Sequence, residues 1–72
     1  PVNDYLTLKV DDISTYDIKL FDARGELIMS QYDLTRNDEI NVSHLNDGVY
    51  VVQVLNGLLT IGTRRVLIQG NN

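Results

Sequence analysis

The chain contains no cysteine and no tryptophan, and it has a single proline and a single phenylalanine among its 72 residues. Without cysteine, a disulfide framework, a thiolate zinc site and an iron–sulfur cluster are all excluded. A chain of this length buries only about 60% of the surface that its unfolded form exposes, and its core supplies a net stability of about 3 to 5 kcal/mol. The sequence therefore predicts one small domain that is held together by packing alone.

Long apolar runs are absent as well. No segment approaches the ~18 consecutive apolar residues that a membrane-spanning helix needs, and no charged start followed by an apolar stretch predicts a secretory signal peptide. The first residue is Pro1 rather than a methionine. We therefore expect no transmembrane segment, and we expect the chain to be part of a longer polypeptide whose N-terminal signal lies elsewhere.

Acidic residues are missing from the last third of the chain. All ten carboxylates lie between Asp4 and Asp47, whereas residues 48–72 contain Arg64 and Arg65 as their only charged side chains. The net charge of −4 argues against nucleic acid as a partner, because binding phosphates requires clustered Lys and Arg. This asymmetry has two interpretations: the last hairpin happens to lack acidic residues, or its two arginines form a charged label for a receptor.

The apolar residues that are present recur with a period of two, which is typical of strands with one solvated face. This alternation covers residues 5–10, 16–20 and 38–42, while residues 49–55 are apolar on both parities except at Gln53. The latter pattern predicts a central strand that is covered on both faces. Residues 30–38 show no pattern and are predicted to form a loop with one helical turn.

Two turn motifs divide these segments. Asp22-Ala23-Arg24-Gly25 predicts a short hairpin loop with a bulge, in which the glycine takes the positive φ. Asn56-Gly57 predicts a two-residue type I′ turn, because Asn tolerates and Gly freely adopts a positive φ.

The second turn fixes an expected register for the last hairpin, with Val54 opposite Leu59 and Val52 opposite Ile61. Beyond Gly62 the apolar parity changes by one residue. Such a change predicts a β-bulge at the glycine.

Short strands at intervals of 8 to 12 residues without a crossover helix predict an all-β fold. The expected architecture is an immunoglobulin-like antiparallel β-sandwich of about seven short strands, with one domain over residues 1–69 and a polar tail over 70–72. The expected core consists of Tyr5, Leu6, Leu8, Val10, Ile18, Leu20, Leu27, Met29, Ile40, Val42, Leu45, Tyr50, Val52, Val54, Ile61, Val66 and Ile68.

Catalytic and metal-binding groups are few. His44 is the only histidine, and Ser43 and Asp47 beside it supply the residue types of a hydrolase triad without any assurance of its geometry. The pair Asp11-Asp12 and the segment 46–48 could supply oxygens to a hard cation, but they are also typical of turns, where Asp and Asn bond to their own backbone. We therefore expect no enzyme activity, no metal site and no cofactor.

The segment 43–57, Ser-His-Leu-Asn-Asp-Gly-Val-Tyr-Val-Val-Gln-Val-Leu-Asn-Gly, resembles the signature of the C-terminal sorting domain of the type IX secretion system (the Por secretion system C-terminal domain family). Further matches in the same order are Pro1 with the strand that contains Leu6 and Leu8, the run 18–22 followed by Gly25, and the ending 64–68. The resemblance covers essentially the whole chain.

The resemblance implies a secretion signal rather than an enzyme. A parent cargo domain would lie N-terminal to the chain, cross the periplasm, and be recognised at the outer membrane by the type IX translocon. A sortase component would then remove the signal at the cell surface, so that the cargo reaches the surface or the extracellular space. The candidate recognition residues are Gly48, Val49, Tyr50, Asn56, Gly57, Gly62, Arg64, Arg65, Val66 and Ile68.

Several of these residues also have purely structural interpretations. Gly48 would provide a positive φ, and Tyr50 would fill the core with its hydroxyl at the rim. Arg64 and Arg65 would protect a strand edge from aggregation, or label an edge at which a receptor adds a strand. A hinge at Gly62 would also allow a dimer by exchange of the last strand.

An alternative function is an adhesive or carbohydrate-binding immunoglobulin-like module of a larger secreted enzyme, and a third is an inert spacer. Carbohydrate-binding modules usually offer exposed aromatic platforms. The chain has four tyrosines, one phenylalanine and no tryptophan, which argues against such a platform.

Overall fold

The computed structural model describes residues 4–8 and 14–69, and all regular structure in these residues is β-strand. The strands are β1 (Tyr5–Leu6), β2 (Tyr16–Phe21), β3 (Leu27–Leu34), β4 (Ile40–Asn41), β5 (Gly48–Asn56) and β6 (Leu59–Ile68). The predicted all-β antiparallel sandwich is confirmed, and the described residues contain six strands where about seven were expected. No helix in the described residues is long and apolar enough to cross a membrane.

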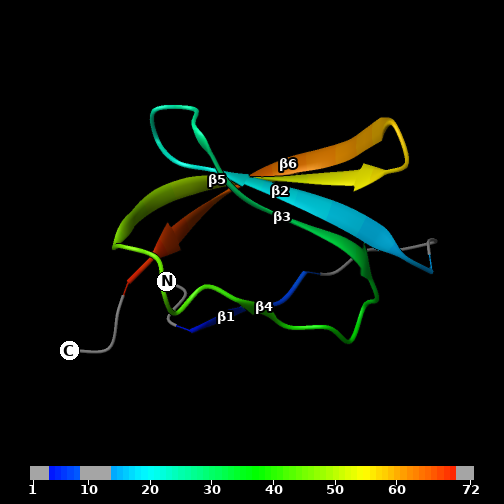
Figure 1. Cartoon of the computed structure of the whole chain (residues 1–72), viewed down its shortest axis with the longest axis horizontal. Helices are drawn as coiled ribbons and strands as arrows, with labels where there is room; N and C mark the ends of the chain where they lie inside the picture. Colours follow the sequence, from blue (N-terminus) through cyan, green and yellow to red (C-terminus); the bar gives the residue numbers. More distant parts are fainter. Residues whose placement is uncertain (1–3, 9–13, 70–72) are drawn as a thin grey trace.

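The strands form two layers of unequal size. Four strands make one sheet in the order β3-β2-β5-β6, and β1 and β4 make a separate two-stranded sheet. Figure 1 shows the small sheet lying against one face of the large one. One further backbone hydrogen bond extends the pairing of the small sheet: the N–H of Val42 donates to the carbonyl of Asp4 at 2.7 Å.

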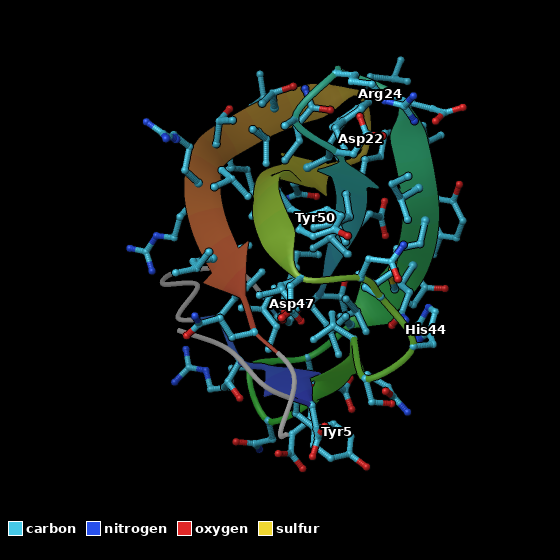
Figure 2. All side chains as sticks on the ribbon, turned by 90° about the vertical axis from the view of Figure 1, so that its left-hand side faces the viewer. Tyr5, Asp22, Arg24, His44, Asp47 and Tyr50 are labelled. Carbon is cyan, nitrogen blue, oxygen red and sulfur yellow. The ribbon has the colours of Figure 1, made fainter. Side chains whose placement is uncertain are left out.

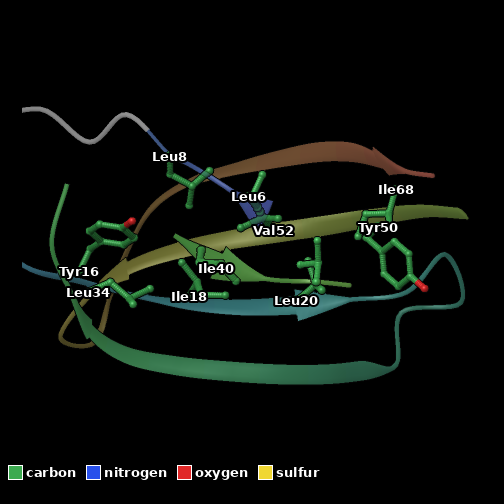
Figure 3. Close-up of a cluster of buried hydrophobic side chains, with 11 residues drawn as sticks. Leu6, Leu8, Tyr16, Ile18, Leu20, Leu34, Ile40, Tyr50, Val52 and Ile68 are labelled. Carbon is green, nitrogen blue, oxygen red and sulfur yellow. The ribbon is translucent and has the colours of Figure 1, made fainter. Parts of the chain in front are cut away.

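The core lies between the two sheets (Figure 3). Its buried side chains are Leu6, Leu8, Tyr16, Ile18, Leu20, Leu34, Ile40, Val42, Tyr50, Val52 and Ile68. Burying one aliphatic side chain of this size contributes about 1.5 to 3 kcal/mol. Because the ordering of the backbone opposes this gain, a core of this size leaves little surplus stability.

The expected core is wrong at three positions and incomplete at two. Tyr5 is 55% exposed, Leu27 49% and Ile61 46%, whereas the buried Tyr16 and Leu34 are missing from the expectation. Tyr5 precedes the buried Leu6 in the same strand, and adjacent strand residues face opposite sides. Met29, Leu45, Val54 and Val66 are partly buried against the core, and Val10 lies outside the described residues.

The turn between β2 and β3 forms as predicted. Gly25 has φ +87°, the N–H of Gly25 donates to the carbonyl of Asp22 at 3.0 Å, and the N–H of Asp22 donates to the carbonyl of Glu26 at 2.9 Å. These bonds define a three-residue loop whose last residue is in the left-handed region, as a hairpin with a glycine bulge requires.

The prediction of a loop over residues 30–38 is wrong for its first half, because β3 continues to Leu34. Alternation is lost in this strand for a physical reason: its register with β2 shifts twice, between Tyr16 and Ile18 and between Leu20 and Phe21. Each shift inserts an extra residue and exchanges the two faces of the strand. The turn that follows is closed by the Asp38 N–H, which donates to the carbonyl of Thr35 at 3.0 Å.

The predicted register of the last hairpin is also wrong. Val54 lies opposite Gly62 and Val52 lies opposite Arg64, while Asn56 lies opposite Leu59. The turn is therefore centred on Gly57 and Leu58, with φ +63° at Gly57, which is the pattern of a type II′ turn instead of type I′. The predicted bulge is present, since the register shifts between Val54 and Leu55 and leaves Ile61 as the extra residue before Gly62.

The strand β5 is central in the large sheet, but it is not covered on both faces as predicted. Tyr50 and Val52 are buried on the inner face, whereas Val49 is 37% exposed and Val51, Gln53 and Leu55 are only partly buried. No second layer covers this outer face within the described residues. The half-burial comes from neighbouring side chains of the same sheet.

Candidate functional site

The ten candidate recognition residues all lie in the hairpin formed by β5 and β6. Gly48, Val49 and Tyr50 begin β5, Asn56 and Gly57 form its end and the turn, and the remaining five lie along β6. Because β6 is the last strand in the sheet order, this hairpin includes one edge of the sheet. The sequence thus located one continuous element, and the structure separates its residues into an internal group and an exposed group.

The internal group is organised by Tyr50 at the entrance to β5 (Figure 2). Its hydroxyl donates a hydrogen bond of 2.7 Å to the carbonyl of Asn46, four residues upstream. This arrangement is a tyrosine corner, which fixes the crossing of the chain into a strand in β-sandwiches. The run Leu-Asn-Asp-Gly-Val-Tyr at 45–50 is therefore the sequence of a structural corner.

Gly48 supports the same corner. Its φ is +157°, and a Cβ built there would lie 3.9 Å from Cε1 of Tyr50. Space is available for that carbon, but an L-residue rarely adopts this φ. The structural interpretation of Gly48 as a position of positive φ is confirmed.

The inner face of β6 closes the corner from the neighbouring strand. Val66 is paired with Tyr50, and Ile68 is paired with Gly48. Ile68 is 1% exposed, and Val66 is partly buried against the core. Both side chains are therefore occupied in packing.

Arg64 and Arg65 form the exposed group. Arg64 is paired with Val52, whose side chain faces the core, and Arg65 is paired with Val51 on the opposite face. Directly paired residues share a face of the sheet, so the two neighbouring guanidinium groups extend to opposite sides of β6. Neither arginine side chain has an ion pair or a hydrogen bond in the part of the chain that the structure describes.

Gly57 and Gly62 differ in what they require of the backbone. Gly57 has φ +63°, whereas Gly62 has no positive φ, and a Cβ at Gly62 would meet no atom within 4 Å. The bulge at Gly62 therefore requires no positive φ of this residue. Gly62 lies at the bulge because the register of β5 and β6 shifts beside it, and the bulge does not depend on the backbone freedom of a glycine.

A neighbouring turn that the sequence did not associate with this site lies beside the corner. A shallow hollow of about 190 Å³ is lined by Asp22, Ala23, Arg24, Asp47, Gly48, Val49 and Tyr50. Figure 2 shows Asp22 and Arg24 above Tyr50, with Asp47 on its other side. The repeated Asp-Gly turn signals at 22–25 and 47–48 were visible in the sequence, but nothing local indicated that they meet.

Asp22 is held in its charged form by the turn that contains it. Its Oδ1 accepts hydrogen bonds of 2.9 Å from the N–H groups of Glu26 and Arg24, and its Oδ2 lies 3.2 Å from Nη2 of Arg24. The bond from the Glu26 backbone lowers the pKa of Asp22 most, followed by the bonds from Arg24 and its charge. Arg24 also contacts Glu26 at 3.0 Å, so these charges are satisfied within the turn.

The residue types of a hydrolase triad do not assemble. The Ser43 hydroxyl donates to Oδ1 of Asn41 at 2.6 Å, so its proton is directed away from His44. His44 is exposed. No three His, Asp or Glu side chains within residues 4–8 and 14–69 are placed to hold a metal ion, and Asp11 and Asp12 lie outside the described residues.

Comparison with protein families identifies the chain as a whole. Residues 1–69 match the family model described as the secretion system C-terminal sorting domain. The chain belongs to this family. No curated protein and no solved structure matched it.

The sorting domain is a C-terminal secretion signal for type IX secretion. Membership implies a type IX secretion system, a cargo part on the N-terminal side, and export through the periplasm to the outer membrane and the cell surface or the extracellular space. The carbohydrate-binding alternative is not favoured. Sorting domains are signals, and the family is not a family of catalysts.

Proposed function

We propose that the chain acts without catalysis of its own, as a folded export signal that the outer-membrane translocon recognises by its tertiary structure. The domain comprises residues 1–69, followed by the polar segment 70–72, and a sortase component separates it from the cargo at the surface. The family match over residues 1–69 supports these bounds.

The observation that carries the proposal is the tyrosine corner. The run that most resembles the family signature, residues 45–50, contributes a buried tyrosine ring and a 2.7 Å hydrogen bond to the Asn46 carbonyl. Side chains used in this way are hidden from a receptor. Asn46, Asp47 and Val49 of the same run are exposed, so the buried Tyr50 preserves the fold, and the receptor recognises the surface that this fold presents.

The candidate residues accordingly have two roles in this proposal. Gly48, Tyr50 and Gly57, with the inner-face residues Val66 and Ile68, shape the hairpin. Val49, Asn56, Gly62, Arg64 and Arg65 remain accessible or partly accessible along its surface and edge. Contact with the translocon is assigned to the accessible group, and to the two arginines first.

A matched pair of variants tests whether the fold is the signal. Val52 is fully buried, and Ile28 is 38% exposed on the opposite edge strand. Val52→Asp places an unpaired charge in the core at a cost on the order of 4 kcal/mol, which consumes the whole stability of a domain this small. Ile28→Asp makes the same change from an aliphatic residue to a carboxylate on the surface, where its effect is about 0.5 kcal/mol.

Both variants are fused to a periplasmically exported reporter in a host with a type IX system. Reporter on the cell surface is expected for Ile28→Asp and absent for Val52→Asp, and circular dichroism of the purified variants reports which of them folds. Export of an unfolded Val52→Asp fusion at the wild-type level would show that the linear sequence is the signal. Equal surface display in a translocon-deficient strain would remove the type IX route altogether.

A dimer formed by exchange of β6 is a second part of the proposal. Among the strands of residues 4–8 and 14–69, β6 pairs with β5 alone, so exchanging it between two copies replaces one ladder by an identical one at low cost. Analytical ultracentrifugation of the chain over a range of concentrations tests this, with a monomer at all concentrations as the contrary result.

A further inference from the structure

Within the described residues, the outer edge of β6 is regular and unpaired over a length that fits one additional strand. From Gly62 to Ile68 the strand makes seven consecutive pairs with β5 without a shift in register. No strand of the described residues occupies its other side. An edge of this kind presents a row of backbone donors and acceptors to any extended chain.

The opposite edge of the same sheet is less suitable. The strand β3 is interrupted by two shifts of register, and Asp33 within it has φ +57°. Bulges of this kind twist an edge and block continuous pairing with another chain. The sheet therefore has one obstructed edge and one open edge.

The charges on the open edge specify the chemistry of the added strand. Arg64 and Arg65 extend to opposite faces, and residues 48–69 contain no carboxylate that could neutralise them. A strand added at this edge places two consecutive side chains on the same two faces, one opposite each arginine. Two consecutive acidic residues would pair with both arginines.

The neighbouring positions add a second requirement. Val66 on the inner face is partly buried, and Leu67 on the outer face is 44% exposed. Apolar side chains opposite these two residues would cover them and exclude water from the backbone bonds. A strand that adds antiparallel to β6 would therefore carry an apolar pair followed by an acidic pair.

We propose that the outer edge of β6, from Gly62 to Ile68, binds an extended partner segment by strand addition, and that two consecutive acidic residues of this segment pair with Arg64 and Arg65. This inference rests on the proposed recognition of the folded domain and names the chemistry of the receptor. The segment belongs to a protein, because the edge offers a ladder of backbone bonds that a lipid or a glycan would leave unused.

The test uses the complete 72-residue chain and short synthetic peptides with two central valines followed by two glutamates, two glutamines or two lysines. Amide chemical shifts of the isotopically labelled chain are followed by NMR during titration at low salt. The glutamate peptide is expected to perturb residues 62–68 and to bind more tightly than the glutamine peptide. Two cross-strand ion pairs predict a difference of about two- to thirtyfold in Kd.

Charge reversal separates the arginines from the rest of the edge. The double variant Arg64→Glu with Arg65→Glu should weaken the glutamate peptide by at least the same factor and should bind the lysine peptide in its place. Arg36→Glu changes an exposed arginine outside the hairpin and should alter neither titration. High salt should reduce the preference for glutamate.

Three results would overturn the proposal. The first is the absence of binding, or binding that is independent of the peptide's charge. The second is perturbation of β3 in place of β6, or self-association of the chain through β6 in place of peptide binding. The third is aggregation of the double variant when the parent chain binds no peptide. The two arginines would then only protect the edge from aggregation. A negative titration leaves the Val52→Asp export result intact, so the two proposals fail separately.

Discussion

Replacing the two buried tyrosines by phenylalanine should have opposite effects on stability. The Tyr50 hydroxyl donates a 2.7 Å hydrogen bond to the Asn46 carbonyl, whereas the buried Tyr16 hydroxyl has no partner within residues 4–8 and 14–69. Each change removes one oxygen and leaves the ring in the core. The pair therefore isolates the hydrogen bond from the packing of the ring.

The expected magnitudes follow from these contacts. Tyr50→Phe removes a hydrogen bond that contributes about 0.5 to 1.5 kcal/mol. In a domain of this size, a loss of about 1 kcal/mol lowers Tm by about 4 to 8 °C. Tyr16→Phe removes a hydroxyl whose burial is not compensated in the described structure, so stability should stay constant or rise by up to about 1 kcal/mol.

Thermal and urea unfolding followed by circular dichroism measure both effects, and alkaline titration adds an independent readout. Burial raises the pKa of Tyr16 above 10.0, and the negative charge of Asp38 adds to this shift. A raised pKa means that stability is complete below the unfolded value near 10 and falls as pH rises through the folded value. Tyr16→Phe should abolish this alkaline loss, and Tyr50→Phe should retain it.

Two outcomes would refute the reasoning. Equal destabilisation by both substitutions would mean that the two hydroxyls are equivalent and that the corner bond has no special contribution. An unchanged Tm for Tyr50→Phe would show that water replaces the hydroxyl at the Asn46 carbonyl without cost.

Three further predictions concern the turns and the loop. The pKa of Asp22 is lowered, so the stabilising effect of its carboxylate is complete above about pH 4 and is lost as pH falls through the folded value. Asp22→Asn should therefore flatten the acid side of a curve of unfolding free energy against pH, and a curve of unchanged shape would contradict this. Gly57→Val should lower the free energy of unfolding by about 1 to 2 kcal/mol because φ is +63° there, while Gly62→Val should change it by no more than about 0.5 kcal/mol. The reverse order in urea unfolding would support a hinge at Gly62. His44→Ala should cost under about 1 kcal/mol and leave reporter export intact, and loss of export would give the exposed imidazole a role in recognition.

The parts of the fold that the sequence predicts correctly depend on local periodicity. Ile18, Leu20 and Ile40 are all buried because a period of two places alternate residues on one face whatever the tertiary context. The turn at Gly25 forms as predicted because its three-residue loop demands a positive φ that glycine supplies. Such features need information from only a few neighbouring residues.

The errors arise where one residue inserted into a strand or turn, or omitted from it, changes the pairing and the facing of the residues that follow. Asn56-Gly57 fits a type I′ turn, but the same glycine also fits the first central position of a type II′ turn one residue later. The choice between them moves every residue of β6 relative to β5, and the dipeptide alone does not decide it. The two bulges in β3 likewise erase the alternation on which its prediction would depend.

The candidate recognition residues show the same division. Their sequence positions identify the hairpin, because the family signature and the basic ending are contiguous motifs. The separation of Arg64 from Arg65 onto two faces follows from strand alternation alone, whereas the openness of the edge beside them depends on the sheet order β3-β2-β5-β6. Sheet order is set by contacts between distant segments, and no local motif determines it.

The thinness of the core also constrains how a receptor can bind this domain. A net stability of about 3 to 5 kcal/mol is comparable to the cost of moving even one buried side chain, so recognition that rearranged the interior would unfold the signal. Strand addition at β6 breaks no contact among the core residues, since the new backbone bonds form on the side that faces away from β5. No binding free energy is then lost in rearranging the fold, so all of it can favour the acidic partner. The fold that presents the edge remains unchanged.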